Sequence, residues 1–285
     1  MIFFVFNKIS GTYTEEREIL IRTRSLKLFE NNFKITYTLP KGDLFVPDID
    51  PDNIVHGDII VAVGGDGTIN LCLQFIHDNL LSEKVSLGSI PAGTGNNMVK
   101  ISGLSKDVVK SIDIIKNNLT RELRYGTIND KKVFFNFSLG FTSFVLNNRR
   151  TNSLIGYAFD GIRSYFSYNG VYVKILSDIS IIEKKVFIAL FINTSHYLSF
   201  IRLIKENDTS GYLNLFYLTG SSKFVNIIKL LPLLFGINFL KKQRLNDLTI
   251  ELQDDQQIEV DGDIYETNEK ILRIKNSNII NFISG

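Results

Sequence analysis

Two glycine-rich segments contain residues whose types and spacing suit the binding of phosphate groups. They are Gly64-Gly65-Asp66-Gly67-Thr68 and Pro91-Ala92-Gly93-Thr94-Gly95-Asn96-Asn97. Glycines let a backbone turn tightly and approach phosphate oxygens, and a helix that follows offers free N–H groups and a positive dipole end. Thr68 can add a hydroxyl donor, whereas the Asp66 carboxylate would repel phosphates unless a cation such as Mg²⁺ lies between them.

Neither segment fits the commonest nucleotide-binding patterns. No Lys-Ser or Lys-Thr follows the glycines at the spacing of a P-loop, and neither segment matches the dinucleotide pattern G-x-G-x-x-G. The alternative for the first segment is an ordinary turn between a strand and a helix, with Asp66 as the helix N-cap. We expect a phosphate site because two such segments each follow an apolar, strand-like run.

The elements around these segments follow the pattern of a mainly parallel sheet with crossover helices. Candidate strands are residues 2–6, 34–39, 58–63 and 85–90, and candidate helices are residues 14–31, 68–81 and 108–119. Ligands of open α/β sheets bind at the carboxyl ends of the strands, so we expect both glycine-rich segments to face one crevice. We therefore predict a nucleotide-binding α/β domain over residues 1–122.

The second half of the chain changes to short β-rich runs. They are residues 132–139, 171–176, 185–192, 212–218, 248–252 and 271–274. This pattern predicts an antiparallel β-rich domain over residues 123–285, and it leaves open whether the final segment returns to the first domain. Residues 155–166 and 223–242 are predicted to be helical, the second segment being kinked or capped around Pro232.

Composition and charge exclude several classes of function. A net charge of +2 with 22% charged residues gives no strong field, so the charge balance does not predict a nucleic-acid partner. The longest apolar stretch, residues 224–240, is interrupted by Lys229, Pro232 and Gly236. Because a bilayer span needs about 20 apolar residues, we expect no transmembrane segment. The single cysteine, Cys72, and a start without a basic leader favour a cytoplasmic protein.

The apolar stretch allows two interpretations. It could be an interfacial element, with apolar side chains toward acyl chains and Lys241, Lys242 and Arg244 toward anionic headgroups. The alternative, and the one that we expect, is a buried helix whose terminal cations complement its dipole.

Together, the two glycine-rich segments resemble those of the diacylglycerol kinase catalytic family, which includes bacterial lipid kinases and sphingosine and ceramide kinases. The resemblance covers nearly the whole chain and is densest at its start. The further segments that carry it are Asn7-Lys8-Ile9-Ser10-Gly11, which is similar to the family's Asn-Pro-x-Ser-Gly, Phe135-Asn136-Phe137, Gly140-Phe141 and Asp261-Gly262-Asp263, which is similar to Asp-Gly-Glu.

The resemblance implies transfer of the γ-phosphoryl group of ATP, with Mg²⁺ as cofactor, to a lipid hydroxyl in a cleft between the two domains. It implies that Asp263 is the general base, that Asp261 orients groups or contacts metal, and that Asp66 is a catalytic metal ligand. Asp208 is a weaker metal candidate. The implied nucleotide-binding residues are Asn7, Lys8, Gly11, Gly64, Gly65, Asp66, Gly67, Thr68, Pro91, Gly93, Thr94, Gly95 and Asn96. The expected partners are a lipid substrate at a membrane surface, with peripheral association, and a second copy in a homodimer.

Three positions depart from the family's pattern around its metal. Asn97, Arg124 and Ser210 stand where many members carry acidic residues, and Asp263 replaces a glutamate. An arginine can neutralise phosphate charge but cannot supply a carboxylate ligand. Two alternatives therefore stay open. One is a NAD kinase-like enzyme, which shares Gly-Gly-Asp-Gly-Thr, and the other is a catalytically silent nucleotide- or lipid-binding protein.

Overall fold

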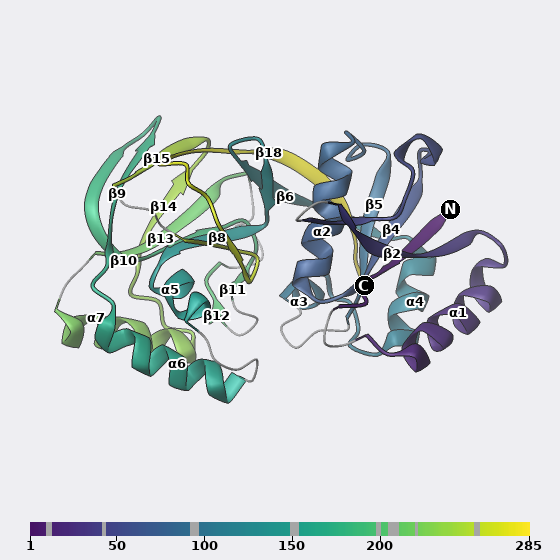
Figure 1. Ribbon diagram of the computed structural model, residues 1–285, viewed down its shortest axis with the longest axis horizontal. Helices are drawn as coiled ribbons and strands as arrows, with labels where there is room; N and C mark the ends of the chain where they lie inside the picture. The colour runs from purple at the N-terminus through teal and green to yellow at the C-terminus, as the bar shows by residue number, and fades with distance from the viewer. Residues whose placement is uncertain are drawn as a thin grey trace. The chain divides into compact units, whose positions relative to one another are not determined.

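The structure is a computed structural model, and it describes residues 1–9, 13–41, 44–91, 97–148, 154–197, 201–204, 211–219, 222–253 and 257–285. These residues form two compact units. Unit 1 comprises Met1–Leu123 and Ile279–Gly285, and unit 2 comprises Arg124–Asn278. Each unit is described by itself below, with the element labels of Figure 1.

Unit 1 is built on a mainly parallel sheet. Its elements in chain order are β1 (Ile2–Phe6), α1 (Glu15–Phe29), β2 (Phe33–Lys41), β3 (Leu44–Pro47), a 3-10 turn η1 (Pro51–Asn53), β4 (Asp58–Gly64), α2 (Asp66–Asp78), β5 (Val85–Pro91), α3 (Asn97–Ser102) and α4 (Val108–Asn117). The strand order is β5-β4-β1-β2-β3, with β3 antiparallel to β2. Every residue of β1 and β4 is buried, as expected for central strands with helices on both faces.

The helices of unit 1 cover both faces of this sheet. The crossover from β1 to β2 and the crossover from β4 to β5 run in opposite directions along the sheet. Because such crossovers are right-handed, α1 and α2 lie on opposite faces. An ion pair between Arg24 and Asp113, with an N···O distance of 2.6 Å, joins α1 to α4, and Figure 1 shows these two helices side by side.

Unit 2 is rich in antiparallel strands. Its elements are β6 (Thr120–Ile128), which begins in unit 1, β7 (Lys132–Phe134), β8 (Asn136–Gly140), α5 (Phe141–Asn147), α6 (Leu154–Ser167), β9 (Val171–Ser177), β10 (Ile181–Ile192), β11 (His196–Tyr197), β12 (Ile201–Arg202), β13 (Leu213–Thr219), α7 (Lys223–Leu230), η3 (Leu231–Phe235), β14 (Lys241–Leu245), β15 (Leu248–Leu252), β16 (Ile258–Val260), β17 (Asp263–Tyr265) and β18 (Ile271–Ile283). The fold class predicted from the sequence is confirmed.

Two hydrophobic cores lie on the two faces of the strands of unit 2. In β13, Leu215 and Tyr217 belong to one core, whereas Phe216 and Leu218 belong to the other. This alternation follows from the two-residue period of a strand. The second core also receives Tyr165 from α6, so this helix packs over that face of the sheet.

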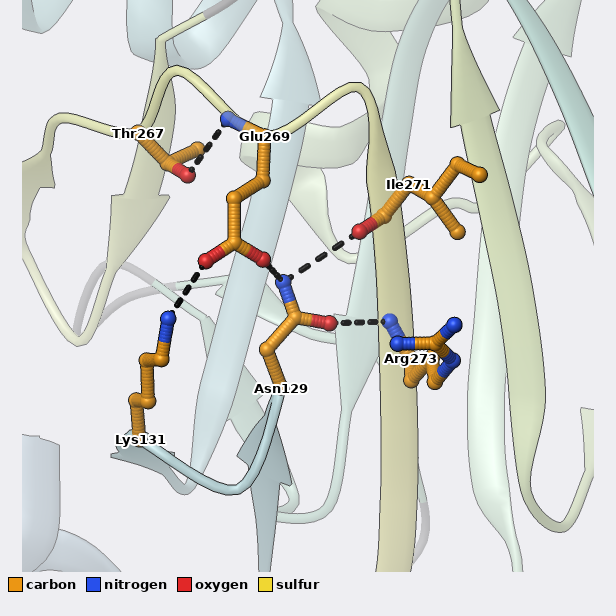
Figure 2. A network of polar contacts seen from close by, with 6 residues as sticks. All are labelled: Asn129, Lys131, Thr267, Glu269, Ile271 and Arg273. Carbon is orange, nitrogen blue, oxygen red and sulfur yellow. Dashed lines mark hydrogen bonds and ion pairs between the residues drawn. The ribbon is translucent and has the colours of Figure 1, made fainter.

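A polar network fastens the β6–β7 turn to the start of β18 (Figure 2). Asn129 has a positive φ of 54° and lies at the tip of this turn. Its side chain donates to a carboxylate oxygen of Glu269 and to the Ile271 carbonyl, while its amide oxygen accepts the Arg273 N–H at 2.6 Å. Lys131 pairs with the other oxygen of Glu269 at 2.7 Å. One asparagine therefore joins segments that are far apart in the sequence.

Two expectations from the sequence are corrected by the fold. The strand expected at residues 271–274 is 13 residues long, and its later residues Asn281 and Phe282 pair in parallel with β5 of unit 1. The stretch from Phe224 to Leu240 is not a single buried helix, because α7 gives way to η3 at Leu231 and several of its apolar side chains are exposed. Among the described residues, no helix is both long and apolar enough to cross a bilayer.

Candidate functional site

Three of the predicted phosphate-binding segments begin at the ends of adjacent parallel strands. Phe6 of β1 pairs with Val63 of β4, and Gly64 of β4 pairs with Pro91 of β5. Asn7, the first glycine-rich segment and the start of the second therefore leave the sheet at one edge. This neighbourhood is the arrangement that places ligands at the carboxyl ends of strands in open α/β sheets.

The first glycine-rich segment leads from β4 into α2, and its first residue, Gly64, has no room for a side chain. A Cβ atom on Gly64 would lie 2.2 Å from Thr68 Oγ1, so only glycine fits there. Thr68 itself is buried. Gly65 is the N-cap of α2, with φ −96° and ψ −169°, and no side chain caps the helix. The first turn of α2 therefore presents N–H groups that no capping side chain takes up.

Asp66 connects the two glycine-rich segments. It is the first residue of α2 rather than the N-cap, which corrects the alternative that we considered from the sequence. Its Oδ1 atom accepts a hydrogen bond from the backbone N–H of Met98 at 3.2 Å. Met98 belongs to α3, which follows the second glycine-rich segment. The carboxylate thus holds the two loops together through one oxygen.

Lys8 lies exposed beside the end of β1. Its ammonium group is 4.0 Å from the centroid of the Tyr37 ring, whose hydroxyl group donates to Glu18 at 2.8 Å. A cation held over an aromatic face keeps its charge available to an anion. Asn7 shapes the same exit, because its Oδ1 atom accepts the N–H of Ile9 at 3.3 Å.

Several predicted site residues lie outside the described part of the chain. They are Gly11, Gly93, Thr94, Gly95, Asn96, Asp208 and Ser210. Asn97 is the first residue of α3, and the structure describes its backbone but not its side chain.

In unit 2, the segment Asp261-Gly262-Asp263 forms a tight turn between β16 and β17. Asp261 and Gly262 have positive φ values of 50° and 97°. The Asp261 carboxylate accepts the N–H groups of Phe135 at 3.0 Å and Asn136 at 2.8 Å, so it holds the turn against the start of β8. Asp263 is exposed at the first position of β17. The geometry gives Asp261 a positioning role and presents Asp263 to solvent.

A buried acid beneath this turn was not predicted from the sequence. Glu259 is 3% exposed, and it accepts hydrogen bonds from Ser138 Oγ at 2.5 Å, Tyr197 Oη at 2.5 Å and the Gly262 N–H at 2.8 Å. Burial raises the pKa of the Glu259 carboxyl, while its hydrogen-bond donors oppose that rise. The sequence contains no signal that Glu259 is buried, because it is a single acidic residue between Ile258 and Val260 in a short strand.

Arg124 places a fixed positive charge beside a cavity of unit 2. Arg124 and Gly211 line an open cavity of about 320 Å³ in unit 2, together with Asp178, Asp247 and three polar residues. A Cβ atom on Gly211 would lie 3.8 Å from the Arg124 guanidinium, so Arg124, which departs from the family pattern, lies beside the glycine that follows Ser210. A fixed cation at this place disfavours a second one. Over the described ranges, no three Asp, Glu, His or Cys residues cluster as metal ligands.

The chain is similar to several known proteins. Residues 1–128 match the family model described as diacylglycerol kinase catalytic domain. A Streptococcus pneumoniae protein named "Putative lipid kinase" is 26% identical over 220 residues, which cover 72% of each chain. A Bacillus subtilis protein named diacylglycerol kinase is 34% identical over 84 residues, which cover 29% of this chain and 27% of that protein. The match to the Bacillus protein thus spans about a quarter of its length.

Solved structures share the fold over the whole chain. A crystal structure described as a diacylglycerol kinase from Bacillus anthracis has a TM-score of 0.72 at 18% sequence identity, and the match covers 100% of this chain and 96% of that one. At this level of identity the likeness establishes the fold.

Proposed function

Because residues 1–128 match the model of the diacylglycerol kinase catalytic domain, we propose that the chain belongs to this family and is an ATP-dependent lipid kinase. The observation that carries the proposal is the pairing of Phe6 with Val63 and of Gly64 with Pro91, since it gathers three candidate phosphate-binding segments at one edge of the sheet. Phosphoryl transfer depends mostly on positioning and on stabilising charge, and such an edge supplies both.

The proposed reaction joins a lipid hydroxyl to the γ-phosphorus of ATP. The hydroxyl oxygen attacks the γ-phosphorus, the bond from that phosphorus to the β–γ bridging oxygen breaks, and ADP leaves. The proton of the hydroxyl passes to the Asp263 carboxylate, which acts as the general base. Backbone N–H groups at Gly65 and the Lys8 ammonium bind phosphate oxygens. Transfer requires Asp263 to lie within hydrogen-bond reach of the acceptor hydroxyl.

Mg²⁺ fits this site only together with ATP. Mg²⁺ commonly uses one or two carboxylates plus substrate phosphates and waters, so a complete cage of protein ligands is not needed. Asp66 accepts the Met98 N–H through Oδ1, and a carboxylate oxygen has lone pairs for more than one partner. We assign Asp66 as the residue that holds the ion, whose chemistry is to neutralise phosphate charge.

Transfer of labelled phosphate from ATP tests the proposal. The acceptors are diacylglycerol, sphingoid base, ceramide and total membrane lipid in detergent micelles, with NAD as a separate acceptor. A labelled lipid supports the kinase and names the acceptor class. Labelled NAD and no labelled lipid would show instead a NAD kinase-like enzyme.

Two variants separate nucleotide binding from transfer. Gly65→Val should abolish ATP binding, because its backbone angles suit valine while the side chain occupies the space of a phosphate. Asp263→Asn should keep ATP binding and lower turnover by about 100-fold or more. Glu266→Gln, an exposed acid three residues along, is the matched control and should leave turnover unchanged.

A silent binding protein is the second candidate, and the position of Arg124 beside Gly211 favours it. The guanidinium stands where a metal ion of the family would need carboxylates. This candidate predicts that ATP raises the unfolding temperature without any turnover across the lipid panel. Turnover that disappears in Asp263→Asn would exclude it.

A further inference from the structure

An exposed apolar face lies on α6, α7, η3 and the segment that follows η3 in unit 2. Its six members are Ile162, Phe166, Phe224, Ile228, Leu231 and Phe239, whose exposed fractions are 60, 66, 73, 54, 54 and 56%. We call this set the apolar face. Single exposed apolar residues are normal on a protein surface, but a group on neighbouring elements marks an interaction site.

The spacing shows that α7 is apolar on two sides. Phe224, Ile228 and Leu231 recur at intervals of four and three residues, so they share the outward side of the helix. Ile227 and Leu230 pack against the core on the inward side. A surface helix normally turns mostly polar residues outward, whereas the outward side of α7 also carries these large apolar side chains. Core packing accounts for the inward side alone.

Contacts between α6 and α7 make the face continuous. The Tyr165 hydroxyl group donates to the Lys223 carbonyl, and the Lys223 ammonium group donates to the Phe166 carbonyl. Figure 1 shows the two helices side by side along one edge of unit 2. Tyr165 is buried while its neighbours Ile162 and Phe166 point outward, so α6 divides its apolar residues as α7 does.

The charges around the apolar face are all of one sign along α7 and the segment after it. Residues 222–245 contain five basic residues and no acidic one, namely Lys223, Lys229, Lys241, Lys242 and Arg244. Two copies of the chain meeting through this face would bring these cations together, which disfavours a homodimer there. Anionic headgroups above an apolar layer complement both the cations and the exposed rings.

We propose that the apolar face docks unit 2 on a membrane that contains anionic lipid. Phe166, Phe224 and Ile228 enter the boundary between headgroups and acyl chains, and the lysines contact the headgroups. This inference places the proposed kinase at the source of a lipid substrate, but it does not require phosphoryl transfer. Docking is measured without nucleotide, so its failure is distinct from a failure of kinase activity in detergent micelles.

Co-sedimentation of the full chain with vesicles tests the inference. The vesicles are phosphatidylcholine alone and phosphatidylcholine mixed with an equal amount of phosphatidylglycerol. Binding should be strong only to the mixed vesicles and should weaken at high salt. Phe224→Ser with Ile228→Ser should weaken it at least about tenfold. Lys229→Glu with Lys241→Glu should weaken binding to the mixed vesicles while leaving the apolar side chains in place.

The matched control removes equally exposed apolar side chains from unit 1. Val55 and Leu80 are 62 and 83% exposed, so Val55→Ser with Leu80→Ser should keep full vesicle binding. Unchanged unfolding temperatures show that each variant is folded. Equal binding of wild type and the Phe224 and Ile228 variant would overturn the inference. A change from dimer to monomer in that variant, without an effect on vesicles, would assign the face to a second copy instead.

Discussion

Glu259 Oε1 accepts the backbone N–H of Gly262 at 2.8 Å, so a buried carboxyl group holds the turn that presents Asp263. The other carboxylate oxygen, Oε2, accepts hydrogen bonds from Ser138 and Tyr197. Asp261 holds the same turn from the opposite end through two backbone N–H groups. Asp263, which we propose as the general base, therefore lies on a turn fixed at both ends, and general-base catalysis requires such a defined position.

Glu259→Gln should change how stability depends on pH. Burial raises the pKa of Glu259, to which the nearby charge of Asp263 adds, so the folded protein keeps this proton at pH values where the unfolded chain has lost it. The carboxyl group therefore costs the wild type stability as the pH rises above the unfolded value of about 4.3. In denaturant unfolding, the free energy of unfolding of the wild type should therefore fall, relative to that of Glu259→Gln, as the pH increases above this value. A difference that is constant with pH would contradict this.

Asp66 should have separable structural and electrostatic roles. Asp66→Asn keeps an oxygen that can accept the Met98 N–H, so its stability should match that of the wild type. Asp66→Ala loses the hydrogen bond and should cost about 1 kcal/mol of unfolding free energy. If the carboxylate holds Mg²⁺ with ATP, both variants should lower turnover by about 100-fold or more. Turnover retained in Asp66→Asn would limit this residue to joining the two loops.

The sequence was most informative where structure is set by local pattern. Strands β1 and β4 are runs of apolar residues buried on both faces, and their ends lie within one residue of the predicted ones. The two glycine-rich exits were expected at neighbouring strand ends, and the pairing of Gly64 with Pro91 confirms this. Such features depend on few residues that are close together in the chain.

Features that depend on distant partners were not predictable. The donors to Glu259 come from Ser138 on β8 and Tyr197 on β11, which no spacing in the sequence relates to it. Likewise, the apolar stretch after Lys223 has the composition of a core helix, and only the packing of Ile227 shows which side faces inward. Arg124 and Gly211 are also far apart in the sequence, and only the folded chain brings them to one cavity.

Asn129→Asp should destabilise unit 2 through charge repulsion. The wild-type side chain donates to Glu269, whereas an aspartate would place a second carboxylate against it (Figure 2). We expect a loss of about 1–3 kcal/mol at neutral pH, which becomes smaller as the carboxylates protonate in acid. Asn129→Gly is the matched control, because it keeps the positive φ and removes the amide without adding charge. Equal losses for both variants at neutral pH would exclude repulsion.

Gly64→Ala should destabilise unit 1 because the added Cβ meets buried atoms. It would lie 2.2 Å from Oγ1 and 2.7 Å from Cβ of Thr68, and we expect a loss of about 1–3 kcal/mol. Gly161→Ala in α6 is the control, since nothing lies within 4 Å of its added Cβ and alanine favours a helix. Combining Gly64→Ala with Thr68→Gly removes the clash, so the two losses should not add. Strict additivity in denaturant unfolding would mean that the clash is relieved by movement of the backbone, and the fit of Gly64 against Thr68 would then not be the reason for glycine at this position.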